Sequence, residues 1–241
     1  MSGHSKWATT KRQKATVDAK RGAIFTKLGN LIAIAARENG GDPNANFSLR
    51  MAVGKAKQAN MPKENIERAI KRGTGELAGN AIEELIYEGF GPAKSQVIIR
   101  CLTDNKNRSA SNIRHIFTEY GGSLGSVLWN FSQKGVIRIV KDELDKANLD
   151  KEIFELELID AGAEDFLSEE EGLIIYTKIE NLQAVRQFLE NNNLAVESAG
   201  IEYVAKENLT VSEEEKDKIE KFIEALEDNE DAADYYTNID I

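Results

Sequence analysis

The chain has 241 residues, of which 41% are hydrophobic and 3 are proline, so it is long enough for two or three packed domains and is expected to be globular throughout. It has no apolar run long enough to span a bilayer and no apolar signal-peptide core in its first residues, which predicts a cytoplasmic protein without a membrane partner. Its single cysteine, Cys101, excludes an internal disulfide and lies in an apolar run, so we interpret it as a buried thiol.

The formal net charge of −10 is unevenly distributed along the chain. Residues 1–73 hold 15 Lys/Arg and 5 Asp/Glu, a balance of +10, which leaves −20 for the remainder. A uniformly acidic surface would repel phosphate. The segregation instead indicates a basic first part that contacts nucleic acid and an acidic body that faces something else.

The basic segment has helical periodicity. Apolar residues at three- and four-residue spacing begin after Val17 and end at the helix terminators Asn39 to Gly41. A second apolar stripe runs from Leu49 to Ala56, and a third begins near Pro62 and ends at Gly73. The sequence therefore predicts three short amphipathic helices that pack as a small domain over residues 1–76.

The next segment changes to the two-residue period of strands. We predict strands over 82–90 and 96–103, a helix over 109–120 and a strand over 127–131. This β-β-α-β series is one helix and one strand short of a complete α+β unit. The end of the chain supplies both, as a Ser212-capped helix followed by a strand over 234–239.

Between these two parts lies a complete second unit. Its predicted elements are a strand over 136–140, a helix over 154–161, strands over 165–167 and 173–177, a helix over 182–189 and a strand over 196–204. The β-α-β-β-α-β order is ferredoxin-like. The predicted fold class is therefore α+β and multidomain, with an N-terminal three-helix domain followed by two ferredoxin-like domains. The last, residues 133–206, is inserted in the middle one, residues 80–132 and 207–241.

No catalytic, cofactor or metal constellation is found in the sequence. His4 and His115 are far apart and neither has a Cys or His neighbour at metal-ligand spacing. Glycines with the spacing of a phosphate-binding or dinucleotide-binding loop are absent. We therefore predict no catalytic residues, no cofactor and no metal, and a protein that is not an enzyme.

A polar cluster stands between the second predicted strand and the following helix. It consists of Asp104, Asn105, Asn107 and Arg108. At a helix N-terminus such side chains could hold an anion, but helix capping and loop closure are the favoured interpretation.

The basic residues near the N-terminus are the candidate nucleic-acid contacts. In the third helix, Glu64 precedes Arg68 by four residues and Glu67 precedes Lys71 by four, so part of that charge is expected to be paired locally. The N-terminal cations face only Asp18 and suit phosphate contacts. Trp7 could stack on a base, or it could pin the N-terminal arm that carries these cations to the helices, and both possibilities remain open. The candidate residues are Lys6, Trp7, Lys11, Arg12, Lys14, Lys20, Arg21 and Lys27.

Several short motifs together resemble one protein family. They occupy residues 3–8, 18–22 with Phe25 and Lys27, 56–62, 66–70, 87–89, 104–108 and 121–125. In combination and over nearly the full chain, the sequence resembles the YebC family, to which the mitochondrial translational activator of cytochrome c oxidase I also belongs. The resemblance implies a helical domain and two α+β domains, the second interrupted by the third. It also implies a non-enzymatic role in gene expression.

Two functions remain open at this point. A DNA-binding transcriptional regulator needs base-edge readers as well as phosphate anchors, and no helix-turn-helix signature stands out. A ribosome- or RNA-associated translational activator or elongation-assisting factor needs only backbone and shape recognition, and its acidic body could contact basic protein surfaces. We keep DNA-binding transcription regulation as the prediction and translation as the alternative. A further hypothesis is that the acidic body folds onto the basic end and screens it.

Overall fold

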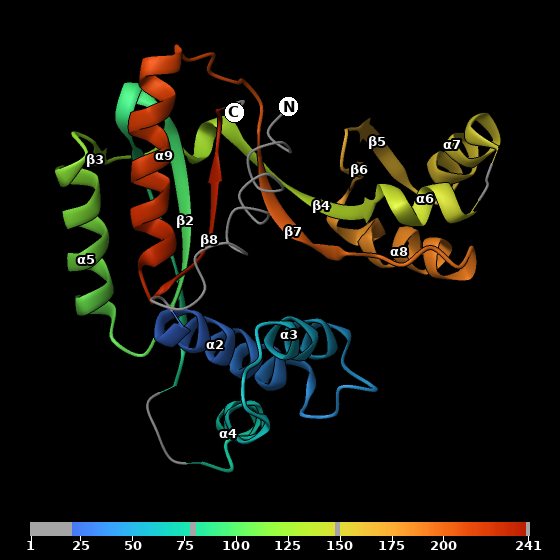
Figure 1. Cartoon of the computed structure of the whole chain (residues 1–241), viewed down its shortest axis with the longest axis horizontal. Helices are drawn as coiled ribbons and strands as arrows, with labels where there is room; N and C mark the ends of the chain where they lie inside the picture. The colour runs from blue at the N-terminus through green and yellow to red at the C-terminus, as the bar shows by residue number, and fades with distance from the viewer. Residues whose placement is uncertain (1–20, 78–80, 148–149, 240–241) are drawn as a thin grey trace. The chain divides into compact units, whose positions relative to one another are not determined.

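The structure is a computed structural model that describes residues 21–77, 81–147 and 150–239 (Figure 1). It has the predicted α+β class, with a helical region followed by two four-stranded sheets in which neighbouring strands are antiparallel. No helix in these ranges combines the length and the apolar character that a bilayer crossing requires.

The helical region contains the three predicted helices, α2 (Arg21–Asn39), α3 (Phe47–Gln58) and α4 (Lys63–Thr74). Their apolar stripes meet in one core that includes Ile32, Leu49 and Ile66. Asn46 caps α3 by accepting a hydrogen bond from the Leu49 N–H at 3.0 Å. Pro62 is the N-cap of α4 rather than its first helical residue.

The first sheet has the strand order β3-β1-β2-β8. A hairpin connects its two central strands, β1 (Glu83–Phe90) and β2 (Gln96–Thr103). Helix α5 (Lys106–Glu119) and the short strand β3 (Ser123–Leu124) follow, and the end of the chain adds α9 (Glu213–Asp228) and β8 (Ala232–Thr237). Phe117 of α5 and Phe222 of α9 pack edge to face, with ring centroids 5.1 Å apart. The predicted Ser212 cap of α9 is present as a capping box with Glu215.

The strand predicted over 127–131 is wrong. Residues Leu128–Asn130 form a single 3₁₀ turn, and the strand that pairs with β1 on the side opposite β2 is the earlier Ser123–Leu124. The apolar run was misleading because Leu128 and Trp129 are exposed rather than buried in a sheet. A longer strand, β4 (Phe131–Val140), begins at the end of the turn. It includes the polar residues between the two separate strands that were expected over 127–131 and 136–140.

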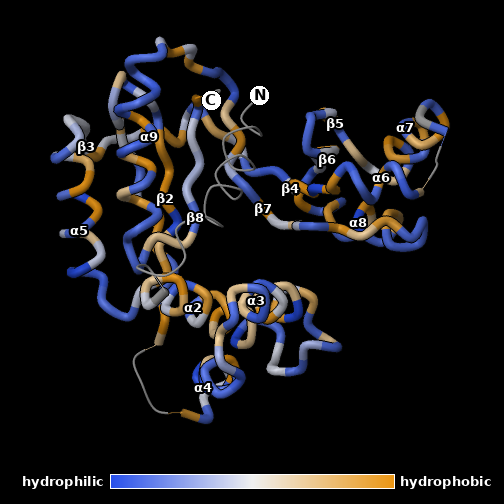
Figure 2. The backbone as a smooth tube through the Cα atoms, in the orientation of Figure 1, coloured by the Kyte–Doolittle hydropathy of each residue, from blue (hydrophilic) through white to orange (hydrophobic). Residues whose placement is uncertain are grey.

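The second sheet has the strand order β5-β6-β4-β7 and the β-α-β-β-α-β sequence of elements, which is ferredoxin-like. Its remaining elements are α6 (Lys141–Ala147), α7 (Lys151–Asp160), β5 (Ala163–Ser168), β6 (Gly172–Thr177), α8 (Leu182–Asn191) and β7 (Ser198–Ala205). Helix α6 was not predicted, because only Leu144 and Ala147 of its residues pack against the core. Figure 2 shows hydrophobic residues along β4 and β6, whose inward side chains include Ile137 and Ile175.

The described chain divides into two compact units. One contains residues 128–209 together with 238–239, and the other contains 21–127 and 210–237. The helical region and the first sheet therefore belong to the same unit. The chain leaves the first sheet after β3 and returns to it in β8, which is the insertion that the fold class predicts. The exact domain limits of 76, 132 and 206 stay predictions.

Candidate nucleic-acid interface

Most of the predicted nucleic-acid contacts lie outside the described residues. These are Lys6, Trp7, Lys11, Arg12, Lys14 and Lys20. Arg21 is the first residue of α2. The part that these residues play in binding stays a prediction.

Lys27 lies at a junction between the helical region and the first sheet. Its ammonium donates a hydrogen bond to the Glu227 carbonyl oxygen, in the last turn of α9, at 2.5 Å. Burial lowers the pKa of Lys27, and the nearby carboxylates of Glu227, Asp228 and Asp234 oppose that shift without cancelling it. The Lys27 ammonium therefore already serves an internal contact, and its part in nucleic-acid binding stays a prediction.

Further contacts tie the helical region to the first sheet. The Asn30 amide donates to the Leu102 carbonyl oxygen at 2.9 Å, and the Arg37 guanidinium donates to the Ile82 carbonyl oxygen at 2.6 Å. A small buried cluster forms from Ala33, Ile34, Ile82 and Leu102. Apolar burial and polar contacts together hold the basic helices on the end of this sheet.

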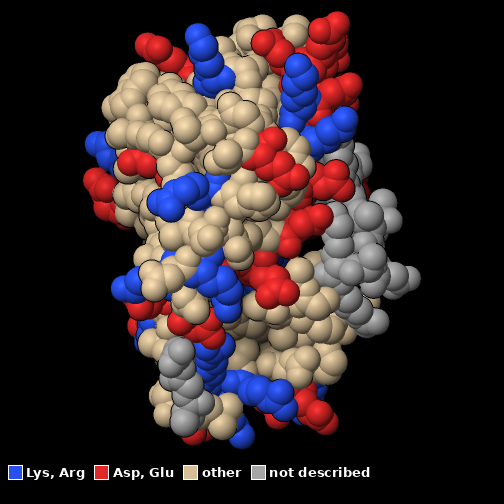
Figure 3. All heavy atoms as spheres, turned by 90° about the vertical axis from the view of Figure 1, so that its left-hand side faces the viewer, with Lys and Arg blue, Asp and Glu red and all other residues tan. Residues whose placement is uncertain are grey.

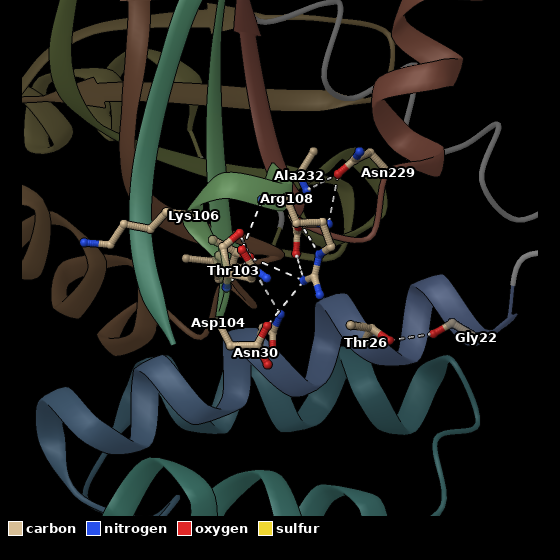
Figure 4. A network of polar contacts seen from close by, with 12 residues as sticks. Gly22, Thr26, Asn30, Thr103, Asp104, Lys106, Arg108, Asn229 and Ala232 are labelled. Carbon is tan, nitrogen blue, oxygen red and sulfur yellow. Dashed lines mark hydrogen bonds and ion pairs between the residues drawn. The ribbon is translucent and has the colours of Figure 1, made fainter. Parts of the chain in front are cut away.

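Three of the four residues of the predicted polar cluster, Asp104, Asn105 and Arg108, form a network between α5 and the loop before β8 (Figure 4). The fourth, Asn107, is an exposed residue in the first turn of α5. Asn105 caps α5 by accepting from the Arg108 N–H at 3.1 Å. The Arg108 guanidinium contacts Asp231 at 2.9 Å and Asp104 at 3.3 Å, and these two carboxylates raise its pKa. Arg72 of α4 contacts the other oxygen of Asp104 at 3.2 Å. The geometry is that of capping and loop closure, and anion binding here stays a prediction.

Four other basic side chains of the helical region are exposed and have neither an ion pair nor a side-chain hydrogen bond within the described ranges. They are Lys55, Lys57, Arg68 and Lys71. The local pairs expected for Arg68 with Glu64 and for Lys71 with Glu67 are not formed. Glu67 instead contacts Lys63, one turn earlier, at 3.6 Å. Figure 3 shows Lys and Arg side chains gathered on the lower part of the face that it presents, at the level of α2 and α4.

The positions of three of these four cations also have a structural reason. Lys55 and Lys57 lie in the last turn of α3, and Lys71 lies in the last turn of α4. Positive charge there stabilises the negative end of the helix dipole. That interaction does not require burial, so the ammonium groups remain available to phosphates.

These four residues were not among the candidates predicted from the sequence. Lys55 and Lys57 could have been found, because no Asp or Glu stands three or four residues from either of them. Arg68 and Lys71 were missed because the spacing of Glu64 and Glu67 suggested that they were paired.

Two other side chains of chemical interest are His115 and Cys101. In the ranges that the structure covers, no three His, Cys, Asp or Glu side chains are grouped as metal ligands would be. His115 is exposed, and its Nε2 lies 3.8 Å from a carboxylate oxygen of Glu119. Cys101 is fully buried, and burial raises the pKa of its thiol to about 12.

Comparison with known proteins identifies the family. The family model described as the TACO1/YebC N-terminal domain matches residues 5–76, and the model of the TACO1/YebC second and third domain matches residues 82–239. A probable transcriptional regulatory protein of Thermoanaerobacter pseudethanolicus is 48% identical, over 100% of this chain and 98% of its own length. Another from Natranaerobius thermophilus is 47% identical, over 100% of this chain and 97% of its own.

A solved structure agrees with this result. The crystal structure of a conserved hypothetical protein, Aq1575, from Aquifex aeolicus matches with a TM-score of 0.79 and 41% sequence identity, over 94% of this chain and 93% of that one. The family models, the similar sequences and the solved structure therefore lead to the same result. The chain belongs to the TACO1/YebC family.

Proposed function

We propose that this protein is a non-enzymatic, nucleic-acid-binding regulator of gene expression, and specifically a DNA-binding transcriptional regulatory protein. The observation that carries the proposal is the set of exposed, unpaired cations Lys55, Lys57, Arg68 and Lys71 on the helical region. The names of the relatives, probable transcriptional regulatory proteins, support the regulatory role.

Binding through such a surface is driven by the phosphate backbone. Each lysine or arginine that neutralises a phosphate releases a condensed counterion, so affinity falls steeply with salt. The junction contacts of Lys27, Asn30 and Arg37 hold α2 on the first sheet, so this surface is presented by a fixed support. Phosphate contacts of this kind position a protein on nucleic acid but do not read its sequence.

The second candidate is a ribosome- or RNA-associated translational activator or elongation-assisting factor. The matched family models name TACO1 beside YebC. Exposed lysines also suit the phosphates of folded RNA, which is recognised largely by shape and backbone. Both candidates use the same surface, so an experiment must separate them by target.

Gradient sedimentation of the native protein in cell lysate separates the two targets. With DNA as the target, the protein should migrate with high-mass material that DNase disperses. Co-migration with ribosomal particles that resists DNase but decreases with salt would replace the DNA assignment with the translational one. Migration of the protein alone at low salt, with or without DNase, would contradict both.

Direct titration tests the surface itself. We expect the double variant Lys55→Gln/Lys57→Gln to weaken binding to a fluorescent mixed-sequence DNA duplex. The magnitude of the slope of log K against log salt should decrease by up to about 0.9 for each phosphate that is no longer neutralised. The matched control is Lys218→Gln/Lys221→Gln, which removes the same charge from exposed positions of α9. Equal weakening by the two variants would show a general charge effect and no interface at α3.

A further inference from the structure

Helix α7 of the second sheet's unit is apolar on two opposite sides. Phe154 and Leu158 point into the core, with exposed fractions of 7% and 0%. Ile153, Leu156 and Ile159 have exposed fractions of 56%, 64% and 53%. Because residues three apart lie on one side of a helix, these three form a continuous stripe opposite the core side, which we call the α7 stripe. Figure 2 shows hydrophobic residues along α7.

The α7 stripe is unusual for an exposed surface. Single exposed apolar residues are common, whereas three large aliphatic side chains in register on one short helix form a patch of the kind that marks interaction sites. The fold of this unit does not require them, since its core is filled by the opposite side of α7 together with the strands and α8. Polar residues at these positions would preserve the same core.

Among the described side chains of α7, all the charged residues that surround the α7 stripe are carboxylates. They are Glu152, Glu155, Glu157 and Asp160. This charge selects the partner, because phosphate or an anionic membrane surface would be repelled. Pairing of two copies through the α7 stripe would bring the same carboxylates against each other, which disfavours self-association.

We propose that the α7 stripe is a docking surface for a basic amphipathic helix of another protein. The apolar side of the partner helix covers Ile153, Leu156 and Ile159, and its flanking Lys or Arg residues face the carboxylates of α7. This is the arrangement of paired amphipathic helices, in which an apolar seam gives affinity and flanking charges select the partner. The stripe is only about 9 Å long at 1.5 Å per residue, so the contact is expected to be small and transient.

This docking surface is independent of the nucleic-acid surface. It lies on the unit with the second sheet, whereas Lys55, Lys57, Arg68 and Lys71 belong to the other unit. A protein with both surfaces could bind nucleic acid and a basic protein at the same time. Failure of either proposal would leave the other unaffected.

The probe for the test is a fluorescent amphipathic peptide with leucine on one side and lysine on the other, titrated against the full chain. We expect Leu156→Ser to weaken its binding by about tenfold or more, as a central interface residue does. Glu152→Gln/Glu157→Gln should weaken binding and reduce its salt dependence. The control Ile201→Ser removes an exposed aliphatic side chain of β7 in the same unit and should leave binding unchanged.

Three results would overturn the proposal. The first is equal binding of the peptide by the native chain and Leu156→Ser, or no binding at all. The second is equal or tighter binding of a peptide in which glutamate replaces every lysine. The third is sedimentation equilibrium that finds a dimer of the native chain and a monomer of Leu156→Ser, which would make a second copy the occupant. Because the three residues are exposed, circular dichroism should confirm that Leu156→Ser is folded.

Discussion

The guanidinium of Arg108 contacts both carboxylate oxygens of Asp231, with Nη2 to Oδ1 at 2.9 Å and Nε to Oδ2 at 3.4 Å. The two residues are 123 positions apart in the sequence, with the whole second sheet between them. Asp231 is buried, and its carbonyl oxygen accepts a hydrogen bond from the Leu102 N–H at 2.8 Å. This ion pair therefore joins the first turn of α5 to the point where the chain returns to the first sheet.

Removal of Arg108 should destabilise the unit that contains the first sheet. Arg108→Ala leaves a buried carboxylate without its cation, and we expect the free energy of unfolding to fall by about 2 kcal/mol. The loss stays below that of a fully buried pair because the Arg108 side chain is about half exposed. Asp231→Asn, which removes the buried charge, should cost less. Urea unfolding of both single variants and the double variant measures the coupling, and additive losses would contradict the pairing.

Replacement of Asn46 should destabilise the protein, and replacement by aspartate should be especially unfavourable. Its Oδ1 caps α3, while its Nδ2 donates to the Ala35 and Gly40 carbonyl oxygens at 2.8 Å each. Asn46→Ala removes three hydrogen bonds from a buried site, and we expect a loss of about 2 to 3 kcal/mol. Asn46→Asp keeps the cap but directs a carboxylate oxygen at two carbonyls, so its loss should be at least as large at neutral pH.

The two Asn46 variants can be compared by thermal unfolding at neutral and acidic pH. Protonation gives the aspartate a donor, so Asn46→Asp should recover part of its stability at acidic pH relative to Asn46→Ala. An aspartate variant as stable as the native chain at neutral pH would show that the Nδ2 hydrogen bonds contribute little.

Two glycines in the helical region should respond to alanine with opposite signs. At Gly73 an added Cβ would lie 2.3 Å from the Ala33 carbonyl oxygen and 2.8 Å from the Ala36 Cβ, so α4 would have to move away from α2. At Gly54, inside α3, an added Cβ meets nothing within 4 Å. We expect Gly73→Ala to destabilise by about 1 to 3 kcal/mol. Gly54→Ala should stabilise by up to about 1 kcal/mol, because alanine is the better helix former.

The comparison of the two variants provides its own control, since both make the same chemical change in neighbouring helices. Thermal melts of the full chain give the two shifts. Shifts of the same sign would mean that the close approach of α2 and α4 at Gly73 does not limit packing there.

Elements with strong local patterns were predictable from the sequence. The three apolar stripes gave α2, α3 and α4 to within a few residues, and β2 was predicted with the bounds that it has, Gln96–Thr103. Local patterns failed where pairing with a strand distant in the sequence determines the secondary structure. Ser132 and Lys134 are polar, yet they are strand residues because they pair with Val204 and Glu202 of β7.

The candidate site shows the same division. The capping role of Asn105 follows from its position before a helix and could be predicted locally. Lys27 could not, because its partner Glu227 lies 200 residues away and nothing near Lys27 in the sequence indicates burial. Charge counts identified the basic region, but which of its cations remain exposed depends on contacts that only the fold defines.

Cys101 should be inert in the native protein. Burial raises the pKa of its thiol to about 12, so almost none of the reactive thiolate is present at pH 8. We expect an aromatic disulfide reagent to label the native chain slowly and the urea-unfolded chain rapidly, with one thiol in total. Rapid native labelling at pH 8 would show that β2 opens readily or that the thiol is accessible.

The N-terminal cations and the exposed lysines of α3 should contribute separately to nucleic-acid binding. We expect Lys11→Glu/Arg12→Glu/Lys14→Glu to weaken duplex binding and to reduce the slope of log K against log salt, by up to about 0.9 for each phosphate that the arm no longer neutralises. Combined with Lys55→Gln/Lys57→Gln, the losses in binding free energy should add, because separate phosphate contacts release separate counterions. Anisotropy titrations at several salt concentrations give both quantities. A triple variant with native affinity and slope would exclude the arm from the interface and leave the α3 surface as the candidate.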